Sequence, residues 1–518
     1  MSLQNLFARR PLLAWSVVVG VAVAGVYAAF SSGMLRRPSA HFHFVDMAAS
    51  FLDGRLDTDT PRRAPSVPPR PGDRRGHQAA IDRHLLGPGG RNNGWNDWAS
   101  YRVLTLKGGE VVKGVFPWKD VPGPRQTEFW TLDGRLMVID VDREVKTGCD
   151  PLRPYSRCDR VVYQVSFPPF PAVVMLPFVA VWGYDVNDVL ITLAGGAVAA
   201  VLLFLWFARM RREGLIVHNL NGQLWLVALF AFGTALFYSS IRGQVWFTAL
   251  VFGAALHVGY LLAAQDARRP LLAGLLFGLG VATRTPLLFA GVFFPLEALL
   301  PRGQWLGGEG MKGFRRAARK LALFALPAAA IGGTLAWLNW VRWENPTEFG
   351  HLYLLEGTRG PTREHGLFNF VFLNGNLGAA ITNMPRLLAE MPFVLVTRHG
   401  LGLIASTPAF LAMLGRLPRP PADVPGLDSA NDSRRRSLER HLLVTILAVA
   451  LPGLLYQNDG WQQYSYRFAI DFLPPLMGFF ALRVPCLTRN AKLLILLAIV
   501  AQAFGAVTFG RFEQFYYD

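Results

Sequence analysis

Long apolar runs separated by short basic segments restrict what this sequence can fold into. The runs are about 15 to 25 residues long, and a helix of that length, at about 1.5 Å per residue, matches a hydrocarbon core of about 30 Å. Hydrophobic residues make up 52% of the 518 residues. The pattern excludes a series of soluble domains and predicts an all-α polytopic membrane protein with about eleven transmembrane helices.

The distribution of positive charge gives these helices a direction. The net charge is +17, and most of the excess lies in short loops between the apolar runs, as is typical of cytoplasmic loops. This explains the charge better than nucleic-acid binding does, and we expect no nucleic-acid partner. Arg9 and Arg10 predict a cytoplasmic N-terminus, and alternation then predicts a periplasmic C-terminus in a multi-pass protein of the bacterial inner membrane.

The same alternation divides the chain into five segments. The first apolar run is read as an uncleaved helix, because the core of a signal peptide has only about 7 to 15 residues. In order, the expected segments are a first transmembrane helix (1–35), a large periplasmic loop (36–169), a transmembrane core (170–341), a second periplasmic loop (342–399) and C-terminal transmembrane helices (400–518).

The large loop begins with residues 41–53, which have the spacing of an amphipathic helix lying at the membrane interface. Apolar positions fall on one face. The other face carries His43, Asp46, Ser50 and Asp53. On this reading alone, Asp46 is either a functional carboxylate or simply part of a solvated face.

The rest of the large loop divides by composition. Residues 61–91 are rich in proline, arginine and glycine and predict a flexible linker. Residues 98–146 alternate β-prone runs with glycine-containing turns, which predicts a small periplasmic insert of two β-hairpins. Cys149 and Cys158 flank a short loop, and we expect them to form a disulfide in an oxidising compartment.

Residues 271–301 are an irregular apolar run with basic residues on both flanks. One continuous helix would place one basic cluster outside. Pro286 disfavours helix in the residue before it, which predicts a broken pair of short helices with Arg284 at its outer apex. An ionisable residue at such depth is a functional candidate, although a long arginine side chain also reaches lipid headgroups from there.

Familiar soluble-enzyme motifs are absent from the sequence. It has no Walker A loop, no HExxH, no GxSxG and no dinucleotide-binding glycine triplet. Polar residues near the apolar runs cluster toward the expected outer side. We therefore expect any chemistry at the periplasmic face, where nucleotide-activated donors are not expected.

Several segments occur in an order that is typical of one enzyme class. After the first helix come HFHFVDMAASFLDGRLD, YQVSFPPFPAVVMLPFVAVWG, GLLFGLGVATRTPLLF and GWQQYSYRFAIDFLPPL. This arrangement resembles the GT-C superfamily of membrane glycosyltransferases, which includes protein O-mannosyltransferases and aminoarabinose transferases. The resemblance implies an inverting glycosyltransferase that moves a sugar from a polyprenyl-phosphate donor to a periplasmic envelope lipid, glycan or protein.

The resemblance also implies a catalytic base soon after the first helix. Asp46 lies in the matching position, and Asp53, two turns later on the same face, is the substitute. Met47 and Ala48 stand where relatives carry a second acidic residue. No cofactor is therefore firmly implied, and a divalent metal has no acidic pair to bind it.

The departing lipid phosphate needs a fixed positive charge, which arginine supplies best. Arg284 and Arg467 are the arginines nearest the expected outer boundary, and Asp471 is placed to pair with Arg467 one helical turn away. Glu348 and His351 in the second loop, with Asp471, are candidates for acceptor contact or support of the site. Two other functions remain open, a lipid or glycan transporter or flippase and a non-catalytic scaffold for envelope assembly.

Overall fold

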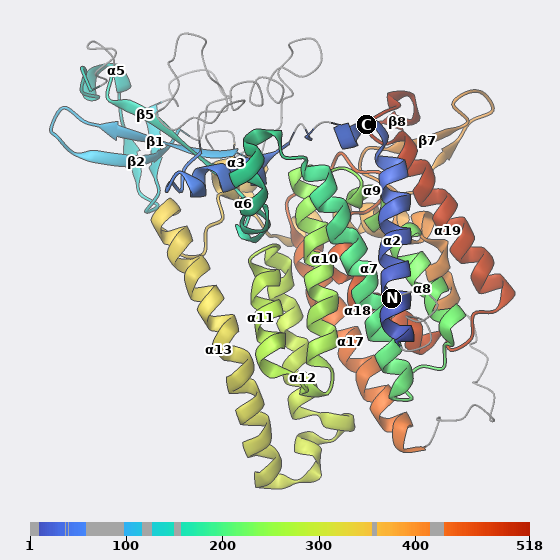
Figure 1. Ribbon diagram of the computed structural model, residues 1–518. Helices are drawn as coiled ribbons and strands as arrows, with labels where there is room; N and C mark the ends of the chain where they lie inside the picture. The colour runs from blue at the N-terminus through green and yellow to red at the C-terminus, as the bar shows by residue number, and fades with distance from the viewer. Residues whose placement is uncertain are drawn as a thin grey trace. The chain divides into compact units, whose positions relative to one another are not determined.

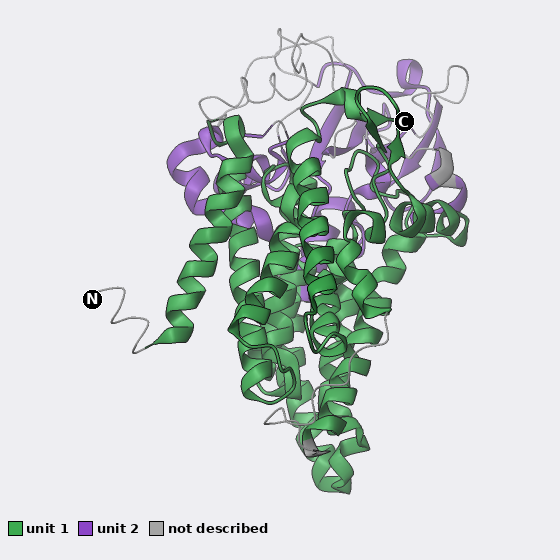
Figure 2. Ribbon diagram, turned by 90° about the vertical axis from the view of Figure 1, so that its right-hand side faces the viewer, with its two compact units in different colours: residues 1–37, 189–331, 368–518 green, residues 38–188, 332–367 purple. Residues whose placement is uncertain are grey.

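The computed structural model describes eight stretches of the chain, and most of the described residues are in helices (Figure 1). They are residues 10–36, 38–39, 41–58, 98–116, 127–149, 157–354, 360–414 and 429–518. The linker expected at 61–91 lies outside these residues. The chain forms two compact units, and Figure 2 colours them separately. Unit 1 contains residues 1–37, 189–331 and 368–518, and unit 2 contains residues 38–188 and 332–367.

Helices form almost all of unit 1. They are α2 (Pro11–Ser31), α7 (Asp188–Arg212), α8 (Leu220–Phe232), α9 (Leu236–Ser240), α10 (Val245–Ala264), α11 (Pro270–Val281), α12 (Phe293–Leu299), α17 (Ser429–Leu455), α18 (Ala469–Arg483) and α19 (Arg489–Thr508), together with the first part of α13 (Gly310–Trp343). Helix α18 packs against both α10 and α17. These contacts make a bundle whose interior is mostly apolar.

Six helices of the described chain are long and apolar enough to cross a membrane. They cover residues 11–36, 188–212, 245–267, 310–343, 431–455 and 489–508. Shorter apolar helices such as α8 and α11 accompany them. A multi-pass helical membrane protein is compatible with this set, and the count of eleven spans stays a prediction.

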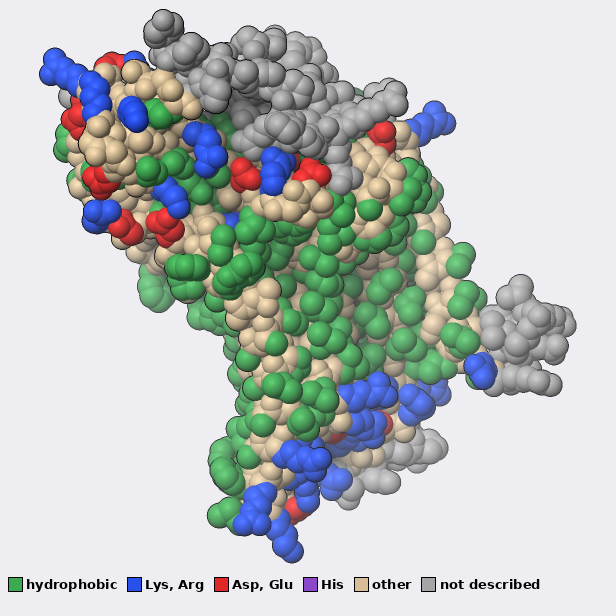
Figure 3. Space-filling view, turned by 60° about the vertical axis from the view of Figure 1, so that its left-hand side comes forward, with side chains coloured by type: hydrophobic (Ala, Val, Ile, Leu, Met, Phe, Trp, Pro, Cys, Tyr) green, Lys and Arg blue, Asp and Glu red, His purple; other side chains and the backbone are tan. Residues whose placement is uncertain are grey.

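The surface of unit 1 changes character along its length. Figure 3 shows hydrophobic side chains along the helices and a concentration of lysine and arginine at the lower end of this face. Arg315, Arg316 and Arg319 are among the exposed basic residues in the first turns of α13. An apolar girdle followed by a basic end is the pattern that a lipid bilayer and its cytoplasmic boundary favour.

The run at 271–301 is a broken pair of helices. Helix α11 ends at Val281, Arg284 is extended, and the 3-10 helix η5 (Thr285–Val292) leads into α12. The backbone N–H of Asp266, which precedes α11, donates to the Glu297 carboxylate on α12 at 2.6 Å. The chain therefore turns back and brings its two basic flanks to the same end of unit 1.

The apolar stretch at 400–415 is not one continuous helix. Over 400–415 the chain forms the short helix α16 (Leu403–Ser406) and the 3-10 helix η11 (Pro408–Met413). Thr407 between them has φ −136° and ψ 67°, which is not helical. The cause is Pro408, because a proline disfavours helix in the residue before it.

Unit 2 contains a five-stranded antiparallel sheet with the order β4-β3-β2-β1-β5. Its strands are β1 (Trp98–Thr105), β2 (Val111–Val115), β3 (Glu128–Thr131), β4 (Leu136–Val138) and β5 (Asp159–Val165). Both expected hairpins are present, with Gly109 and Gly134 at positive φ in their turns. Strand β5, which we did not expect, pairs with β1 over its whole length.

Each face of this sheet carries a buried apolar cluster. On one face Tyr101 and Val162 pack with Trp343 and Leu354, which come from the far end of α13 and the segment after it. On the other face lies a cluster of Leu104, Val112, Phe129, Ile139, Val145 and Cys158. The sulfur atoms of Cys158 and Cys149 are bonded to each other, with Cα atoms 4.9 Å apart.

Shorter elements complete the described chain. Unit 2 also has α3 (His43–Leu52), α5 (Val141–Glu144), α6 (Phe170–Trp182), the 3-10 helix η8 (His351–Tyr353) and α14 (Gly360–His365). Unit 1 has α15 (Leu373–Leu377) and a small sheet of β6 (Arg386–Leu387), β7 (Val394–Thr397) and β8 (Tyr516–Tyr517). The segment expected as one second loop, 342–399, is thus divided between the two units after residue 367.

Candidate functional site

Asp46 is a buried carboxylate held by two aromatic side chains. Its side chain is on α3, and the residue is only 2% exposed. One carboxylate oxygen accepts from the indole N–H of Trp98 at 2.9 Å. The other accepts from the hydroxyl of Tyr184 at 2.6 Å. Two donors on different elements therefore fix the orientation of this carboxylate.

Helix α3 does not have the solvated face that its spacing predicts. Every residue from His43 to Ser50 is buried, including polar residues of the expected wet face. The reason is that α3 packs against α6 and also contacts β5. The interpretation of Asp46 as part of a solvated face is therefore wrong.

Aromatic rings surround the Asp46 carboxylate. The imidazole of His43 stacks on Trp98 with ring centroids 3.8 Å apart. Phe42 meets Trp98 and Tyr184 edge-on, at 5.9 and 5.8 Å. Trp98 is the first residue of β1 and is paired with Val165 on β5, so the sheet insert supplies one wall of this site.

Asp53, the expected substitute for Asp46, has a different environment. It caps the C-terminus of α3 and is exposed. Asp53 follows Asp46 by two helical turns, but α3 ends at Leu52. The contacts that bury α3 therefore do not extend to Asp53. Asp53 is therefore exposed, whereas Asp46 is buried.

Glu348 and His351 belong to unit 2, in the segment that follows α13. The Glu348 carboxylate is buried and accepts from the backbone N–H of Gly350 at 2.5 Å. Burial raises the pKa of Glu348, and backbone N–H groups of this segment act in the opposite direction. Gly350 has φ 93°, and a Cβ there would lie 2.5 Å from the Trp343 ring. Glu348 therefore organises a tight turn against Trp343.

A chain of ring contacts connects this turn to α3. The His351 ring lies 6.1 Å from Phe167, and Phe167 lies 5.8 Å from Phe44 on α3. His351 is half-buried. The structure thus brings His351 and the Asp46 helix into one packed region of unit 2.

Arg284 forms a buried ion pair with Asp471 in unit 1. Its Nε and Nη2 donate to the two oxygens of Asp471 at 3.0 and 2.6 Å. The side chains are 14% and 4% exposed. The four-residue spacing predicted that Asp471 pairs with Arg467, but its partner is Arg284. Arg467 lies before the first turn of α18 and therefore does not share a helical face with Asp471.

Arg467 lies in an aromatic cage. Its guanidinium carbon is 5.5, 5.7 and 5.9 Å from the ring centroids of Phe247, Phe468 and Trp246. The guanidinium carbon of Arg284 is 5.8 Å from the same Phe468 ring. The structure therefore brings the two predicted arginines together around Phe468.

Some partners of these groups were not predicted from the sequence. Trp98 and Tyr184 are 52 and 138 residues from Asp46, and no local spacing points to them. In unit 1, Nδ1 of His257 on α10 bonds the backbone oxygen of Asp471 at 2.9 Å. This contact fixes the first turn of α18 beside Arg284.

Within the eight stretches that the structure describes, no group of three or more His, Cys, Asp or Glu residues is arranged to hold a metal ion. Asp46 is in unit 2 and the two arginines are in unit 1.

No protein-family model, curated protein or solved structure matches this chain.

Proposed function

We propose that this protein is an inverting glycosyltransferase of the GT-C type. It moves a sugar from a polyprenyl-phosphate donor to an envelope lipid, glycan or protein at the periplasmic face of a bacterial inner membrane. The observation that carries the proposal is the Asp46 carboxylate, which is buried soon after the first apolar helix and oriented by Trp98 and Tyr184.

In this proposal Asp46 is the general base. The acceptor hydroxyl attacks the anomeric carbon, and its proton passes to the Asp46 carboxylate as the bond between that carbon and the phosphate oxygen breaks. Attack from the side opposite the phosphate inverts the anomeric centre. The two hydrogen bonds to Asp46 support this role, because a base acts efficiently only when its orientation is fixed before the reaction.

The arginines of unit 1 stabilise the departing polyprenyl phosphate. Arg467 is the principal phosphate ligand, since its guanidinium lies among aromatic rings and offers a planar fork of donors. Arg284 already gives Nε and Nη2 to Asp471, so it reaches phosphate through Nη1. Asp471 is then a positioning residue that fixes the plane of the Arg284 guanidinium.

The Arg284–Asp471 pair also supports a second candidate function. Ionisable pairs inside apolar helices often mark the path of a transported substrate, and this pair joins the broken helices at 271–301 to α18. A lipid or glycan flippase would use such a pair without any glycosyl transfer.

One reconstitution separates the two functions. Full-length protein in proteoliposomes receives polyprenyl phosphates that carry a radiolabelled hexose or aminopentose, with an extracted envelope fraction as acceptor. Release of polyprenyl phosphate with transfer of label, lost in Asp46→Asn and retained in Asp53→Asn, supports glycosyl transfer. Translocation of the intact labelled lipid without release of polyprenyl phosphate would replace this proposal with the flippase.

A further inference from the structure

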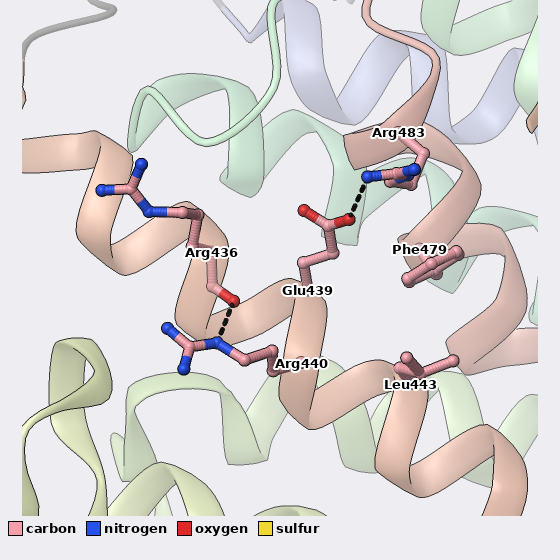
Figure 4. Close-up of a pocket in the computed structure, with 6 residues that line it drawn as sticks. All are labelled: Arg436, Glu439, Arg440, Leu443, Phe479 and Arg483. Atoms are coloured by element: carbon pink, nitrogen blue, oxygen red, sulfur yellow. Dashed lines mark hydrogen bonds and ion pairs between the residues drawn. The ribbon is translucent and has the colours of Figure 1, made fainter. Parts of the chain in front are cut away.

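A groove between α17 and α18 in unit 1 combines basic and apolar side chains. Its cavity volume is about 400 Å³. Figure 4 shows the side chains that line it, which are Arg436, Glu439, Arg440, Leu443, Phe479 and Arg483. Neither the proposed base nor the proposed phosphate ligands belong to this groove.

The groove keeps a net positive charge after its internal ion pairs are counted. Arg483 pairs with Glu439 at 3.0 Å, and Arg436 pairs with Asp432 at 2.6 Å. Nε of Arg440 donates to the backbone oxygen of Arg436 at 3.3 Å. No carboxylate of the described residues forms an ion pair with Arg440. Arg440 is therefore the cation that an incoming anion meets.

An apolar stripe continues from these arginines along α17. Arg436, Arg440, Leu443, Leu447 and Leu451 are spaced by three or four residues, which places them on one face of the helix. The three leucines are 41%, 62% and 52% exposed. The same face therefore offers a charged end and then an exposed apolar surface within one of the six helices long enough to span a membrane.

We propose that this groove is a binding site for an anionic phospholipid. The phosphate lies against Arg440 and Arg436, whose guanidinium groups bind phosphate oxygens in a planar fork. The acyl chain follows Leu443 and Leu447. Basic pockets between helices at a membrane boundary select anionic headgroups in this way. A free phosphate would leave the apolar stripe unused, and a zwitterionic lipid carries its own cation beside the phosphate.

The test is a lipid titration of the full-length protein in a mild detergent. Short-chain phosphatidylglycerol is added, and native mass spectrometry counts the lipids bound per protein. Parallel titrations use phosphatidylcholine of the same chain length, glycerol phosphate without acyl chains, and polyprenyl phosphate. We expect one saturable phosphatidylglycerol per protein, with weaker binding of the other three.

Matched variants locate the bound lipid. Arg440→Gln should weaken phosphatidylglycerol binding about tenfold, the usual scale for one charge-assisted hydrogen bond. Arg440→Lys should retain most of the affinity, which guards against a folding defect. Arg315→Gln is the control, because Arg315 is exposed at the basic start of α13 and does not line the groove.

Each other outcome overturns the proposal in a distinct way. Equal weakening by Arg315→Gln would show general attraction to a basic surface. Non-saturable binding would show ordinary annular lipid. Glycerol phosphate binding as tightly as the lipid would make this a free-phosphate site, and stronger binding of polyprenyl phosphate would assign the groove to the isoprenoid carrier. Because no sugar transfer is measured, failure here is independent of failure of the glycosyltransferase proposal.

Discussion

Asp46 in unit 2 and Asp471 in unit 1 are both buried carboxylates, yet different groups hold them. Asp46 accepts hydrogen bonds from an indole and a phenol. Asp471 accepts both hydrogen bonds of an arginine fork. Removing either member of such a buried ion pair leaves the other charge without its partner. Burial alone therefore does not show what a carboxylate does, and we use the groups that bind each aspartate to predict different effects of substitution.

The largest effect that this comparison predicts is on stability at Asp471. Asp471→Leu leaves the Arg284 charge buried, and we expect it to lower the free energy of unfolding by about 3–5 kcal/mol. The double variant Asp471→Leu with Arg284→Met should recover most of that loss, since neither charge remains. Thermal unfolding in detergent measures both variants.

A matched control for this pair exists in unit 2. Lys113 and Glu344 form a 2.7 Å ion pair in which both side chains are about two-fifths exposed. Glu344→Gln should cost no more than about 1 kcal/mol. A double variant at Asp471 and Arg284 as unstable as the single one would contradict the structural role of the pair.

The next effect is on turnover at Asp46. Asp46→Asn keeps the size of the side chain but removes its capacity to accept a proton. It should lower the rate of sugar transfer by about 100-fold or more and leave donor affinity nearly unchanged. Initial rates and donor titrations in nanodiscs measure the two quantities. A wild-type rate in Asp46→Asn would end the assignment of Asp46 as the base.

A smaller effect is expected at Arg467. Arg467→Lys keeps the charge but loses the planar fork, and it should weaken donor binding and turnover together by about tenfold. Arg398→Lys is the control, because Arg398 pairs with Glu513 at 2.8 Å and is partly exposed. A change in turnover without any change in donor affinity would mean that Arg467 does not hold the ground-state phosphate.

The smallest effect concerns Glu348 and pH. Its folded pKa is raised above the ordinary 4.5 by burial, so its contribution to stability is fully present below pH 4.5 and is lost as the pH rises through the folded pKa. Glu348→Gln should therefore flatten the decline in melting temperature between acidic and neutral pH. An unchanged pH profile in this variant would show that Glu348 does not titrate in that range.

Local features of the sequence predicted much of the architecture. Glycine turns predicted both hairpins, and the Pro286 break predicted the paired short helices. Strand β5 was missed because a strand is recognised only with its partner, and β1 lies about 60 residues earlier. Hydropathy alone favours one continuous helix over 400–415, but Pro408 ends the helix at Thr407.

The site was predictable as residue types but not as contacts. Asp46, Arg284 and Arg467 were recognisable as polar residues in apolar surroundings, but their environments depend on distant segments. Arg284 and its partner Asp471 are 187 residues apart. Helical spacing instead suggests that Asp471 pairs with Arg467, which is four residues away. Local periodicity also predicted a solvated face for α3. The spacing of residues within a helix contains no information about the elements that cover the second face of that helix.

The late arrival of Trp343 and Leu354 in the core of unit 2 affects how the chain is made. Strands β1 to β5 are complete once residue 165 has been synthesised, but the residues that cover one sheet face come almost 200 positions later. At about 5 to 20 residues per second, that interval is roughly 10 to 40 s. During it the apolar face around Tyr101 and Val162 lacks its cover. We therefore expect the sheet to complete its packing only after α13 and the segment that follows it have been synthesised.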